Sequence, residues 1–376
     1  MPYILATSTA TPSYYYKQQE LADALRNYLV DVNLDFNDAI IDRLFCSAQI
    51  YGRYFALPLV HSAEQPAFSA ANAAGIEAAL DLCESAVGTL LDQVGLAPKD
   101  IAQIASVSII PTLVVPSLEA RLMNRLPFRP GTKRISFGGM GCAGGAYAVG
   151  RMADYLKGHP EEAVMILSCE IVSVCWQGSV QRELADLIRR LPNKPGLRSR
   201  LMGALVTMAL FGDGVAAVLM VGDRHPLAVS GGYEVVESGS LLTPDTGGLL
   251  GAEIVETGIR GNLHPSLPER ARHGLRAAVD ALLEAQGLSE DRVDEWILHP
   301  GGPKVMDALQ EEFHLSPLAF QRARALWAQG GNVESASVLL ILDRILAEVS
   351  PEPGSYAILA AMGPGFCQEV SLLRWA

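Results

Sequence analysis

The sequence predicts an α/β protein in which helices cover buried strands. Segments whose apolar residues recur at helical spacing, such as residues 70–94, alternate along the chain with short continuous apolar segments, such as residues 163–172. Continuous apolar runs of this length are typical of strands that are buried on both faces. The same rhythm on both sides of residue 225 predicts two related halves, 1–225 and 226–376, in one layered fold.

The predicted elements follow one another without a long structureless gap. In the first half, strands are expected at residues 1–13, 101–110, 133–137, 163–172 and 215–222. Helices are expected at 70–94 and directly after Cys142, where Val149, Met152 and Leu156 share one face. In the second half, strands are expected at 227–238, 295–301, 356–361 and 369–375, and helices at 267–286 and 332–348.

The composition is typical of a packed, acidic, globular protein. Of 376 residues, 49% are hydrophobic and 19% are charged, which is enough apolar material for a full core. The formal net charge is -12, and no cluster of Lys and Arg is set among aromatic residues, which argues against a nucleic-acid partner. We expect no membrane span, because no apolar run is long enough.

The cysteines and the N-terminus point to a reduced, cytoplasmic protein. The six cysteines form no CxxC pair and have no zinc spacing with histidine, so we expect free thiols and no metal site. The N-terminal segment is predicted to be a strand, because it lacks the basic region and long apolar run of a signal peptide.

One segment, residues 177–205, interrupts the alternation and concentrates positive charge in an acidic chain. Its basic residues are Arg182, Arg189, Arg190, Lys194, Arg198 and Arg200. A solvated helix and loop would explain them, because charged runs usually lie on the surface. The alternative is a patch that receives an anionic substrate or an acidic partner.

Cys142 is the first candidate for a catalytic group. It lies in GGMGCAGGAYAVG, between an expected strand and an expected helix. Backbone N–H groups and the dipole at a helix N-terminus favour a thiolate. Gly141, Gly144 and Gly145 would leave room for an approaching group. A structural cysteine in a glycine-rich turn would explain the same motif.

Two polar residues could serve a nucleophilic cysteine. His299 ends the apolar strand EWIL and begins the turn PGGP, and sites in α/β sheets form at strand ends. Asn332 follows two glycines and precedes a long apolar helix, so its amide could donate to a developing oxyanion. The simpler interpretation of His299 is a structural histidine at the end of a strand. The simpler interpretation of Asn332 is a helix N-cap with Glu334 in the first turn. MGPGFCQ, residues 362–368, could line a cavity or form a hairpin turn.

Taken in order, these motifs resemble those of the type III polyketide synthases, the chalcone synthase-like branch of the thiolase superfamily. GCAGG, ALFGDG, LHPGGP, GGN and GPGF match the family's order and approximate spacing over nearly the whole chain. SLEARLMNRL and GPGFCQEVSLLRW look most like bacterial enzymes that make alkylresorcinols and alkylpyrones. The resemblance implies a homodimer with a thiolase-like, five-layered αβαβα fold of two duplicated halves, the first carrying Cys142 and the second His299 and Asn332.

The resemblance also implies a reaction. Cys142 would take an acyl group from a thioester, and His299 and Asn332 would hold the thioester carbonyl of malonyl-CoA while it loses CO2. The enolate would attack the acyl group, and after repeated extension the chain would cyclise to an alkylpyrone or alkylresorcinol. His299 would pair with the Cys142 thiolate, no metal or redox cofactor would be needed, and CoA or acyl-carrier-protein thioesters would be the substrates.

Further positions match the family's substrate-binding residues. Phe211 matches one of two gatekeeper phenylalanines between the CoA tunnel and the cavity. The other gatekeeper position holds Gly261, which would widen the passage. Val115 matches the residue that reaches across the dimer into the partner's cavity. The resemblance places Cys175, Thr207, Ala252, Glu334, Gly363, Pro364 and Gly365 at the substrate cavity and Arg43, Gly301 and Lys304 at the CoA site.

Three features depart from the family pattern. The positions near Arg43 that usually hold lysine hold Ile40 and Ser47. The segment after Trp176 is longer than usual and basic, and we expect it to help receive an acidic donor such as an acyl carrier protein. Glu334 stands where small residues are usual, and it would alter cyclisation, shorten the pocket or point harmlessly out of its helix.

Three other interpretations are open. A single-step 3-ketoacyl-acyl-carrier-protein synthase would use the same Cys, His and Asn, although such chains are usually shorter and lack GPGF. A thiolase would need a second catalytic cysteine, for which Cys367 is the candidate. A degenerate member that acts as a scaffold is disfavoured, because Cys142, His299 and Asn332 are all present.

Overall fold

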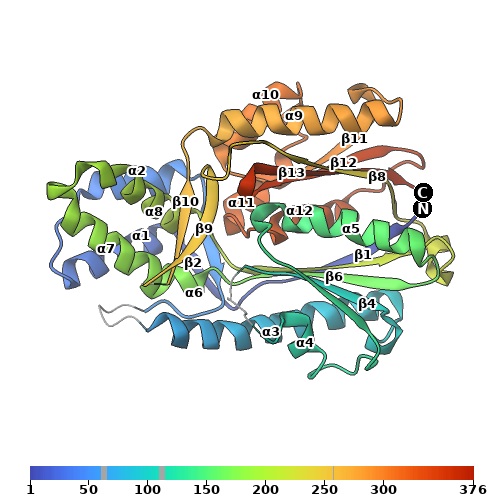
Figure 1. The fold of residues 1–376 in the computed structure, drawn as a ribbon, viewed down its shortest axis with the longest axis horizontal. Helices are drawn as coiled ribbons and strands as arrows, with labels where there is room; N and C mark the ends of the chain where they lie inside the picture. The colour runs from blue at the N-terminus through green and yellow to red at the C-terminus, as the bar shows by residue number, and fades with distance from the viewer. Residues whose placement is uncertain (61–65, 110–114, 257) are drawn as a thin grey trace.

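Layers of strands and helices make up most of the molecule, with a helical lobe at one end (Figure 1). The structure is a computed structural model that describes residues 1–60, 66–109, 115–256 and 258–376. Both termini lie at the end opposite the lobe (Figure 1). In the part of the chain that is described, no helix is long and apolar enough to cross a membrane.

One hydrogen-bonded sheet runs through the layered body in the order β11-β12-β13-β8-β1-β7-β6-β4-β5. Its strands are β1 (Tyr3–Ala10), β4 (Gln103–Val107), β5 (Lys133–Phe137), β6 (Ala163–Glu170), β7 (Gly214–Val221), β8 (Tyr233–Leu242), β11 (Val293–Leu298), β12 (Tyr356–Gly363) and β13 (Cys367–Trp375). β1 and β8 pair only where Tyr3 faces Glu234 and Ile4 faces Tyr233. On either side of this short seam the strands separate into two layers (Figure 1).

The two strand layers repeat one topology. The order β4-β6-β7-β1 in one layer corresponds to β11-β12-β13-β8 in the other. In each layer the first pair is parallel and the following pairs are antiparallel. This repeat confirms the expected fold of two duplicated halves. The expected boundary at residue 225 falls in the connection between β7 and β8.

Helices fill the space between the strand layers and cover their outer faces. α5 (Gly144–Gly158) and α12 (Ala336–Glu348) lie in the middle, and each packs against strands of both layers (Figure 1). The outer helices are α3 (Phe68–Val94) and α4 (Leu118–Leu122) on one side, and α9 (Leu267–Ala285) and α10 (Pro303–Glu312) on the other. Because helices cover both faces, every residue of β6 and β7 is buried, which explains their continuous apolar sequences.

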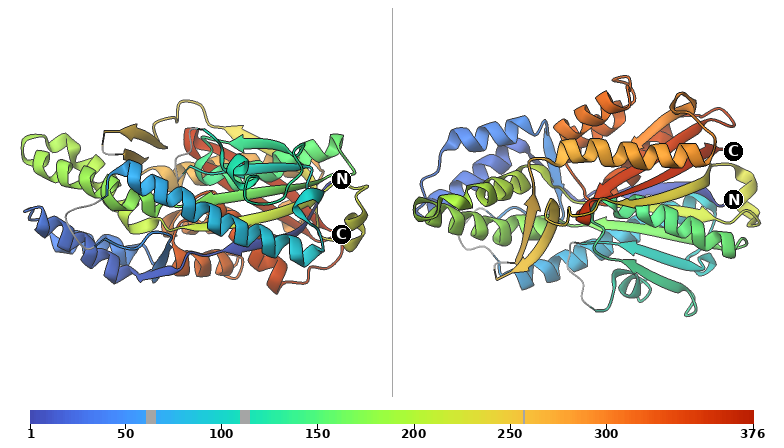
Figure 2. Two further views of the ribbon diagram at one scale, coloured as in Figure 1. Left: turned by 90° about the horizontal axis from the view of Figure 1, so that it is seen from below. Right: turned by 45° about the horizontal axis from the view of Figure 1, so that its top comes forward.

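The helical lobe contains the segment 177–205 together with two helices from the start of the chain. Its helices are α1 (Gln18–Asp31), α2 (Asp38–Ser47), α7 (Gln181–Arg190) and α8 (Arg198–Leu210). A hairpin of β9 (Leu250–Val255) and β10 (Gly258–Leu263) lies between the lobe and the layered body (Figures 1 and 2). The remaining elements are β2 (Tyr14–Lys17), β3 (Gly52–Phe55), α6 (Ser173–Cys175) and α11 (Gln321–Gly330).

The structure changes several expected boundaries. The strand expected from residue 227 begins at Tyr233, because residues 226–230 form a 3₁₀ turn. α12 begins at Ala336, because Glu334 has a φ of 44° and interrupts helical geometry. The strand expected at 101–110 ends at Val107, and Ile110 lies outside the described residues.

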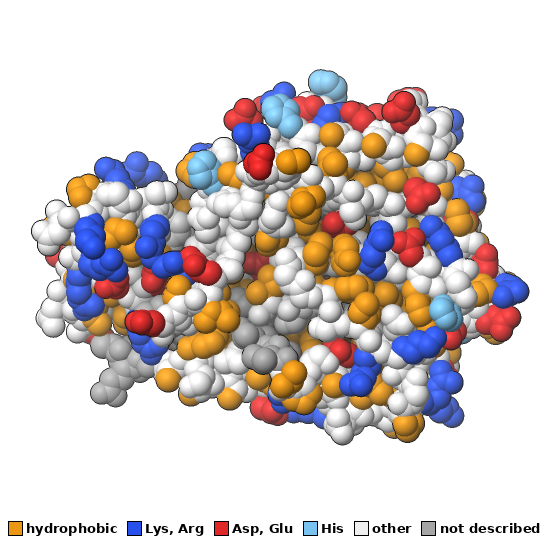
Figure 3. Space-filling model, in the orientation of Figure 1, with side chains coloured by type: hydrophobic (Ala, Val, Ile, Leu, Met, Phe, Trp, Pro, Cys, Tyr) orange, Lys and Arg blue, Asp and Glu red, His pale blue; other side chains and the backbone are white. Residues whose placement is uncertain are grey.

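The segment 177–205 forms two helices joined by an exposed connection, and its charged face is solvated as its composition predicts. α7 and α8 form most of it, and they bury Leu184, Leu187, Leu201 and Leu205. Its basic residues from Arg189 onward stay exposed. Lys and Arg side chains accordingly gather over the lobe (Figure 3).

Candidate active site

Cys142 lies in a 3₁₀ turn, Gly141–Ala143, that leads from β5 into α5. A Cβ atom on Gly144 would lie 2.4 Å from Val107 Cγ1, and one on Gly145 would lie 2.3 Å from the Ser335 carbonyl oxygen. These glycines are therefore required for the close packing of α5 on β4 and on the start of α12. The expectation that they leave room for a ligand is wrong for these two positions.

The loop that carries Asn332 is joined to the loop that carries Phe211. The Asn332 N–H donates to the Leu210 carbonyl oxygen at 2.8 Å, and the Gly212 N–H donates to the Asn332 carbonyl oxygen at 2.9 Å. Gly331 has a φ of 71°, and a Cβ atom there would lie 2.3 Å from the Leu210 oxygen. Gly331 is therefore needed to bring Asn332 next to Phe211.

The Asn332 side chain is oriented by two donors. Its Oδ1 accepts hydrogen bonds from the Glu334 N–H at 2.9 Å and from the Ser337 hydroxyl at 3.3 Å. Its Nδ2 then lies 3.7 Å from the sulfur of Cys142. An amide donor is thus held against the sulfur with its oxygen already occupied.

Glu334 contacts the sulfur directly. The Cys142 thiol donates to Glu334 Oε2 at 2.8 Å. Burial, followed by the neighbouring Glu334 carboxylate, raises the pKa of Cys142 well above its usual value. Burial also raises the pKa of Glu334, and the hydrogen bond from Cys142 acts in the opposite direction. The arrangement favours a neutral thiol beside a carboxylate over a free thiolate.

His299 follows β11, and its backbone N–H donates to the Ala360 carbonyl oxygen at 2.9 Å. The side chain is 2% exposed, and its buried Nδ1 has no hydrogen-bond partner among the described residues. Burial lowers the pKa of His299 to about 4, so the imidazole is neutral at neutral pH. Within the described part of the chain, the Cys142 sulfur bonds to Glu334 and Asn332 and not to His299.

The three expected catalytic residues nevertheless converge. Cys142, His299, Asn332 and Glu334 line one narrow cavity of about 70 Å³, together with Phe211. The cavity offers a thiol, a neutral imidazole and an amide donor within an apolar wall. Such groups can hold an acyl group on sulfur and stabilise negative charge on a carbonyl oxygen.

A larger cavity of about 440 Å³ opens from the same sulfur. Its wall contains eight of the expected substrate-binding residues, namely Cys175, Thr207, Phe211, Ala252, Gly261, Glu334, Pro364 and Gly365. Gly363 does not line it; a Cβ atom there would lie 2.3 Å from the Met140 carbonyl oxygen. Val115 does not line it either and is 80% exposed.

The expected CoA-binding residues come from two parts of the chain, α2 and the start of α10. Gly301 lines the narrow cavity beside His299. Arg43 is exposed on α2, and Lys304 is exposed in the first turn of α10. No hydrogen bond or ion pair joins these side chains to one another among the described residues.

Sequence reasoning placed Ala252 and Gly261 at the cavity but missed the β9–β10 hairpin that carries them and its other wall residues. Leu250, Ile259, Asn262 and Leu263 of this hairpin line the large cavity. An alternation of apolar and polar residues along the two short strands could have predicted the hairpin. Glycines at 251, 258 and 261 interrupt this alternation and obscure it.

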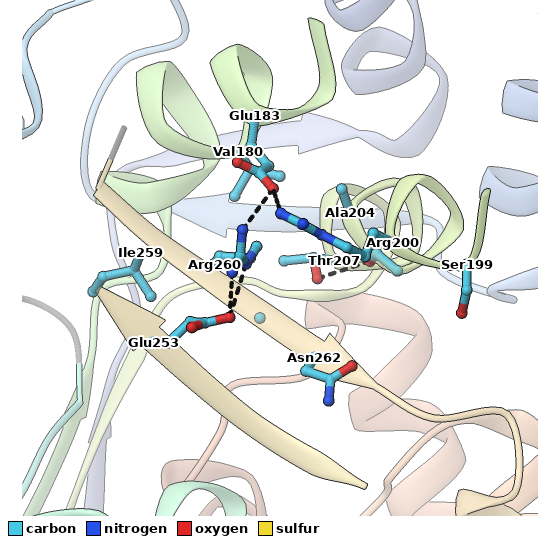
Figure 4. Close-up of a pocket in the computed structure, with 12 residues that line it drawn as sticks. Val180, Glu183, Ser199, Arg200, Ala204, Thr207, Glu253, Ile259, Arg260 and Asn262 are labelled. Carbon is cyan, nitrogen blue, oxygen red and sulfur yellow. Dashed lines mark hydrogen bonds and ion pairs between the residues drawn. The ribbon is translucent and has the colours of Figure 1, made fainter. Parts of the chain in front are cut away.

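A side pocket of about 280 Å³ adjoins the large cavity between α8 and β10 (Figure 4). In its wall Glu183 bonds to Arg200 at 2.9 Å and to Arg260 at 3.3 Å, and Arg260 also pairs with Glu253 (Figure 4). The residues common to the walls of both spaces are Val180, Thr207, Ile259, Gly261 and Asn262. Gly261 therefore stands between the two spaces.

Comparison with known proteins places the chain in one family. A family model described as FAE1/type III polyketide synthase-like protein matches residues 14–185, and one described as the C-terminal domain of chalcone and stilbene synthases matches residues 234–375. The chain is 36% identical over 372 residues to 1,3,6,8-tetrahydroxynaphthalene synthase from Streptomyces peucetius subsp. caesius, covering 99% of this chain and 93% of that protein. The chain belongs to the type III polyketide synthases. The synthase is therefore an acyltransferase that acts as a condensing enzyme.

Further comparisons agree with this family. The synthase is 27% identical over 383 residues to 3,5-dihydroxyphenylacetyl-CoA synthase from Streptomyces toyocaensis, covering 100% of this chain and 90% of that protein. It superimposes on the crystal structure of 1,3,6,8-tetrahydroxynaphthalene synthase from Streptomyces coelicolor A3(2) with a TM-score of 0.84 at 28% identity, covering 99% of each chain. The thiolase-like fold is thus confirmed, and the single-step alternative is not favoured.

Proposed function

We propose that this synthase extends an acyl group on Cys142 by repeated decarboxylative condensation with malonyl-CoA and releases an alkylpyrone or alkylresorcinol. The observation that supports the proposal most is the convergence of the Cys142 sulfur, Asn332 Nδ2 and the His299 ring on one cavity. The proposal needs no metal or redox cofactor, because each step moves only protons, CO2 and acyl groups.

The proposed extension step uses Asn332 and His299 as donors. When malonyl-CoA loses CO2, the electron pair of the broken C–C bond becomes an enolate with its charge on the thioester oxygen. Asn332 Nδ2 and a ring N–H of neutral His299 donate to this oxygen. The enolate carbon attacks the acyl carbonyl on Cys142, and the Cys142 thiolate leaves. Gly301, Arg43 and Lys304 are proposed to bind the CoA portion of the substrate.

The size of the large cavity and the side pocket that adjoins it supports a long acyl starter. The large cavity has mainly apolar walls, and Gly261 separates it from the side pocket with no side chain of its own. A starter could therefore continue from the cavity toward α8. Cyclisation of the extended chain would take place in the large cavity, where Cys175, Thr207 and Ala252 form the wall.

Replacement of Gly261 by phenylalanine tests this path. The new Cβ atom would lie 3.3 Å from Thr207 Oγ1, so the ring must fill the passage. We expect kcat/KM for long-chain acyl-CoA starters to fall about 10- to 100-fold, with short starters affected less than threefold. Steady-state kinetics with acyl-CoA starters of increasing chain length measure kcat/KM for each starter. Gly248→Phe, on the exposed loop before β9, is the control; equal losses for short and long starters would contradict the path.

We also propose that the exposed basic residues of α7 and α8 receive an acyl carrier protein. Arg189, Arg190 and Arg198 are exposed, and Arg198 begins the helix whose Arg200 lines the side pocket. Carrier proteins are acidic, so the charges are complementary. The same synthase is proposed to work as a homodimer, in which a partner covers the exposed Val115.

Replacement of Arg189, Arg190 and Arg198 by alanine is expected to slow loading from an acyl carrier protein about tenfold at low salt. Loading from the matching acyl-CoA should change less than twofold, because the cavity is untouched. Arg129, Arg134 and Arg224, three exposed arginines of the layered body, provide a control variant with the same charge change. Equal effects on both donors would contradict carrier-protein docking at this surface.

Product analysis tests the proposed reaction as a whole. The purified synthase is incubated with malonyl-CoA and a ladder of acyl-CoA starters, and products are identified by mass spectrometry. We expect triketide and tetraketide pyrones or resorcinols that contain the starter. An aromatic product that contains no starter, such as the tetrahydroxynaphthalene or phloroglucinol for which two relatives are named, would contradict the acyl starter. A product of one condensation would contradict iteration.

A further inference from the structure

We propose that Glu334 is a catalytic residue that accepts the proton of the Cys142 thiol when the sulfur attacks the starter thioester. The proposal rests on the proposed function, in which Cys142 carries the acyl group. In this proposal Glu334 acts in acyl loading, and other residues set the size of the cavity and the mode of ring closure.

The contact geometry carries this proposal. Glu334 Oε2 lies 2.8 Å from the Cys142 sulfur, which is a hydrogen bond with the thiol as donor. Glu334 also lines both the narrow cavity and the large one, so its carboxylate faces the space where a thioester would bind. A general base must lie within hydrogen-bond reach of the proton that it removes, and Glu334 does.

The backbone at Glu334 is held in a conformation that aims the side chain inward. Its φ of 44° lies in the left-handed region, which non-glycine residues seldom adopt. The Glu334 N–H bonds to Asn332 Oδ1, and the next residue, Ser335, donates to Glu170 Oε1 at 2.6 Å. Strained conformations of this kind persist where the surroundings fix them, and they cluster at active sites.

Glu334 is the acceptor that the Cys142 thiol contacts, whereas no hydrogen bond joins this sulfur to His299 among the described residues. Among the described residues, the Cys142 sulfur makes its hydrogen bonds to Glu334 and Asn332, and Asn332 is a donor toward it. No described lysine or arginine makes a hydrogen bond to this sulfur. The thiol donates to Glu334 at 2.8 Å, and burial and the neighbouring Glu334 raise the pKa of Cys142, so the protonated sulfur is favoured and its attack on a thioester needs a proton acceptor.

The proposed loading step balances in protons and bonds. The S–H bond of Cys142 breaks and its proton moves to Glu334, while the sulfur forms a bond to the thioester carbonyl carbon. The tetrahedral intermediate then collapses, and the bond from carbon to the CoA sulfur breaks. The departing CoA thiolate takes the proton from Glu334. The products are acyl-Cys142, CoA with a free thiol, and an ionised Glu334.

Single-turnover acylation without malonyl-CoA isolates this step. The synthase is mixed with an acyl-CoA starter, and the released CoA thiol is followed by stopped flow. Wild type, Glu334→Asp and Glu334→Gln are compared. We expect Glu334→Gln to acylate about 100- to 1,000-fold more slowly and Glu334→Asp to recover part of the rate. A normal solvent deuterium isotope effect on wild-type acylation is also expected, because a proton is transferred in this step.

Malonyl-CoA decarboxylation by the same variants shows that the site is intact. This partial reaction needs no proton from Cys142, so we expect it to fall much less than acylation in Glu334→Gln. Acylation by Glu334→Gln at the wild-type rate or faster would overturn the proposal, because removal of the carboxylate lowers the thiol pKa and favours a thiolate. If the wild type decarboxylates malonyl-CoA but takes acyl groups from no thioester onto Cys142, the proposed function itself fails.

Discussion

Replacement of Cys142 by alanine is expected to lower polyketide formation by about three orders of magnitude or more, while malonyl-CoA is still decarboxylated. Cys142 lines both the narrow and the large cavities. Without it no acyl group can be held for attack by the enolate. Asn332 and His299 remain in place to bind the thioester oxygen, so CO2 release can continue.

The two activities are measured separately, by product mass spectrometry and by CO2 or acetyl-CoA formation. Cys367→Ala is the matched control, since Cys367 is another buried thiol but lies outside both cavity walls. We expect this variant to keep both activities within a few-fold. Retained polyketide synthesis in Cys142→Ala would contradict covalent catalysis and revive the scaffold interpretation, and loss of activity in Cys367→Ala would favour a thiolase-like role.

Replacement of Asn332 by alanine is expected to lower malonyl-CoA decarboxylation about 100- to 1,000-fold, which corresponds to roughly 3–4 kcal/mol of lost enolate stabilisation. The amide is oriented by the Glu334 N–H and the Ser337 hydroxyl, so its Nδ2 is the free donor toward the cavity. The measurement is acetyl-CoA formation from malonyl-CoA without a starter.

Two further variants separate the donor from the loop geometry. Asn332→Asp keeps an acceptor for both orienting donors but removes the N–H donor, and it should lose at least as much decarboxylation as the alanine variant. Gln329→Ala removes an exposed amide that bonds to Arg344 outside the site, and it should have no effect. Wild-type decarboxylation by Asn332→Asp would rule out an oxyanion role for Asn332.

Much of the fold follows from periodicity in the sequence. The continuous apolar runs at residues 163–172 and 215–222 correspond to β6 and β7, which are buried on both faces, and the helical spacing at 70–94 corresponds to α3. The β9–β10 hairpin was not predictable in this way. Its strands are short and only partly buried, so the pattern of apolar residues is weak.

The candidate site was predictable in its members but not in its contacts. The order of the motifs identified Cys142, His299 and Asn332, and the structure brings them to one cavity. Among the described residues the Cys142 thiol makes its contact with Glu334, and its expected pairing with His299 stays a prediction. Glu334, two residues after Asn332, has a left-handed backbone conformation that directs its side chain inward. The sequence around Glu334 indicates the start of a helix, and sequence alone cannot reveal such a backbone angle.

Covalent loading of Cys142 is tested most directly by mass spectrometry of the protein itself. The synthase is incubated with an acyl-CoA starter, quenched and digested, and the peptide that contains Cys142 is analysed before and after addition of malonyl-CoA. We predict the mass of the starter acyl group on this peptide, lost in Cys142→Ala, followed by masses larger by whole ketide units. Product formation with no acyl group on Cys142, or with the acyl group on a different residue, would contradict the proposed chemistry.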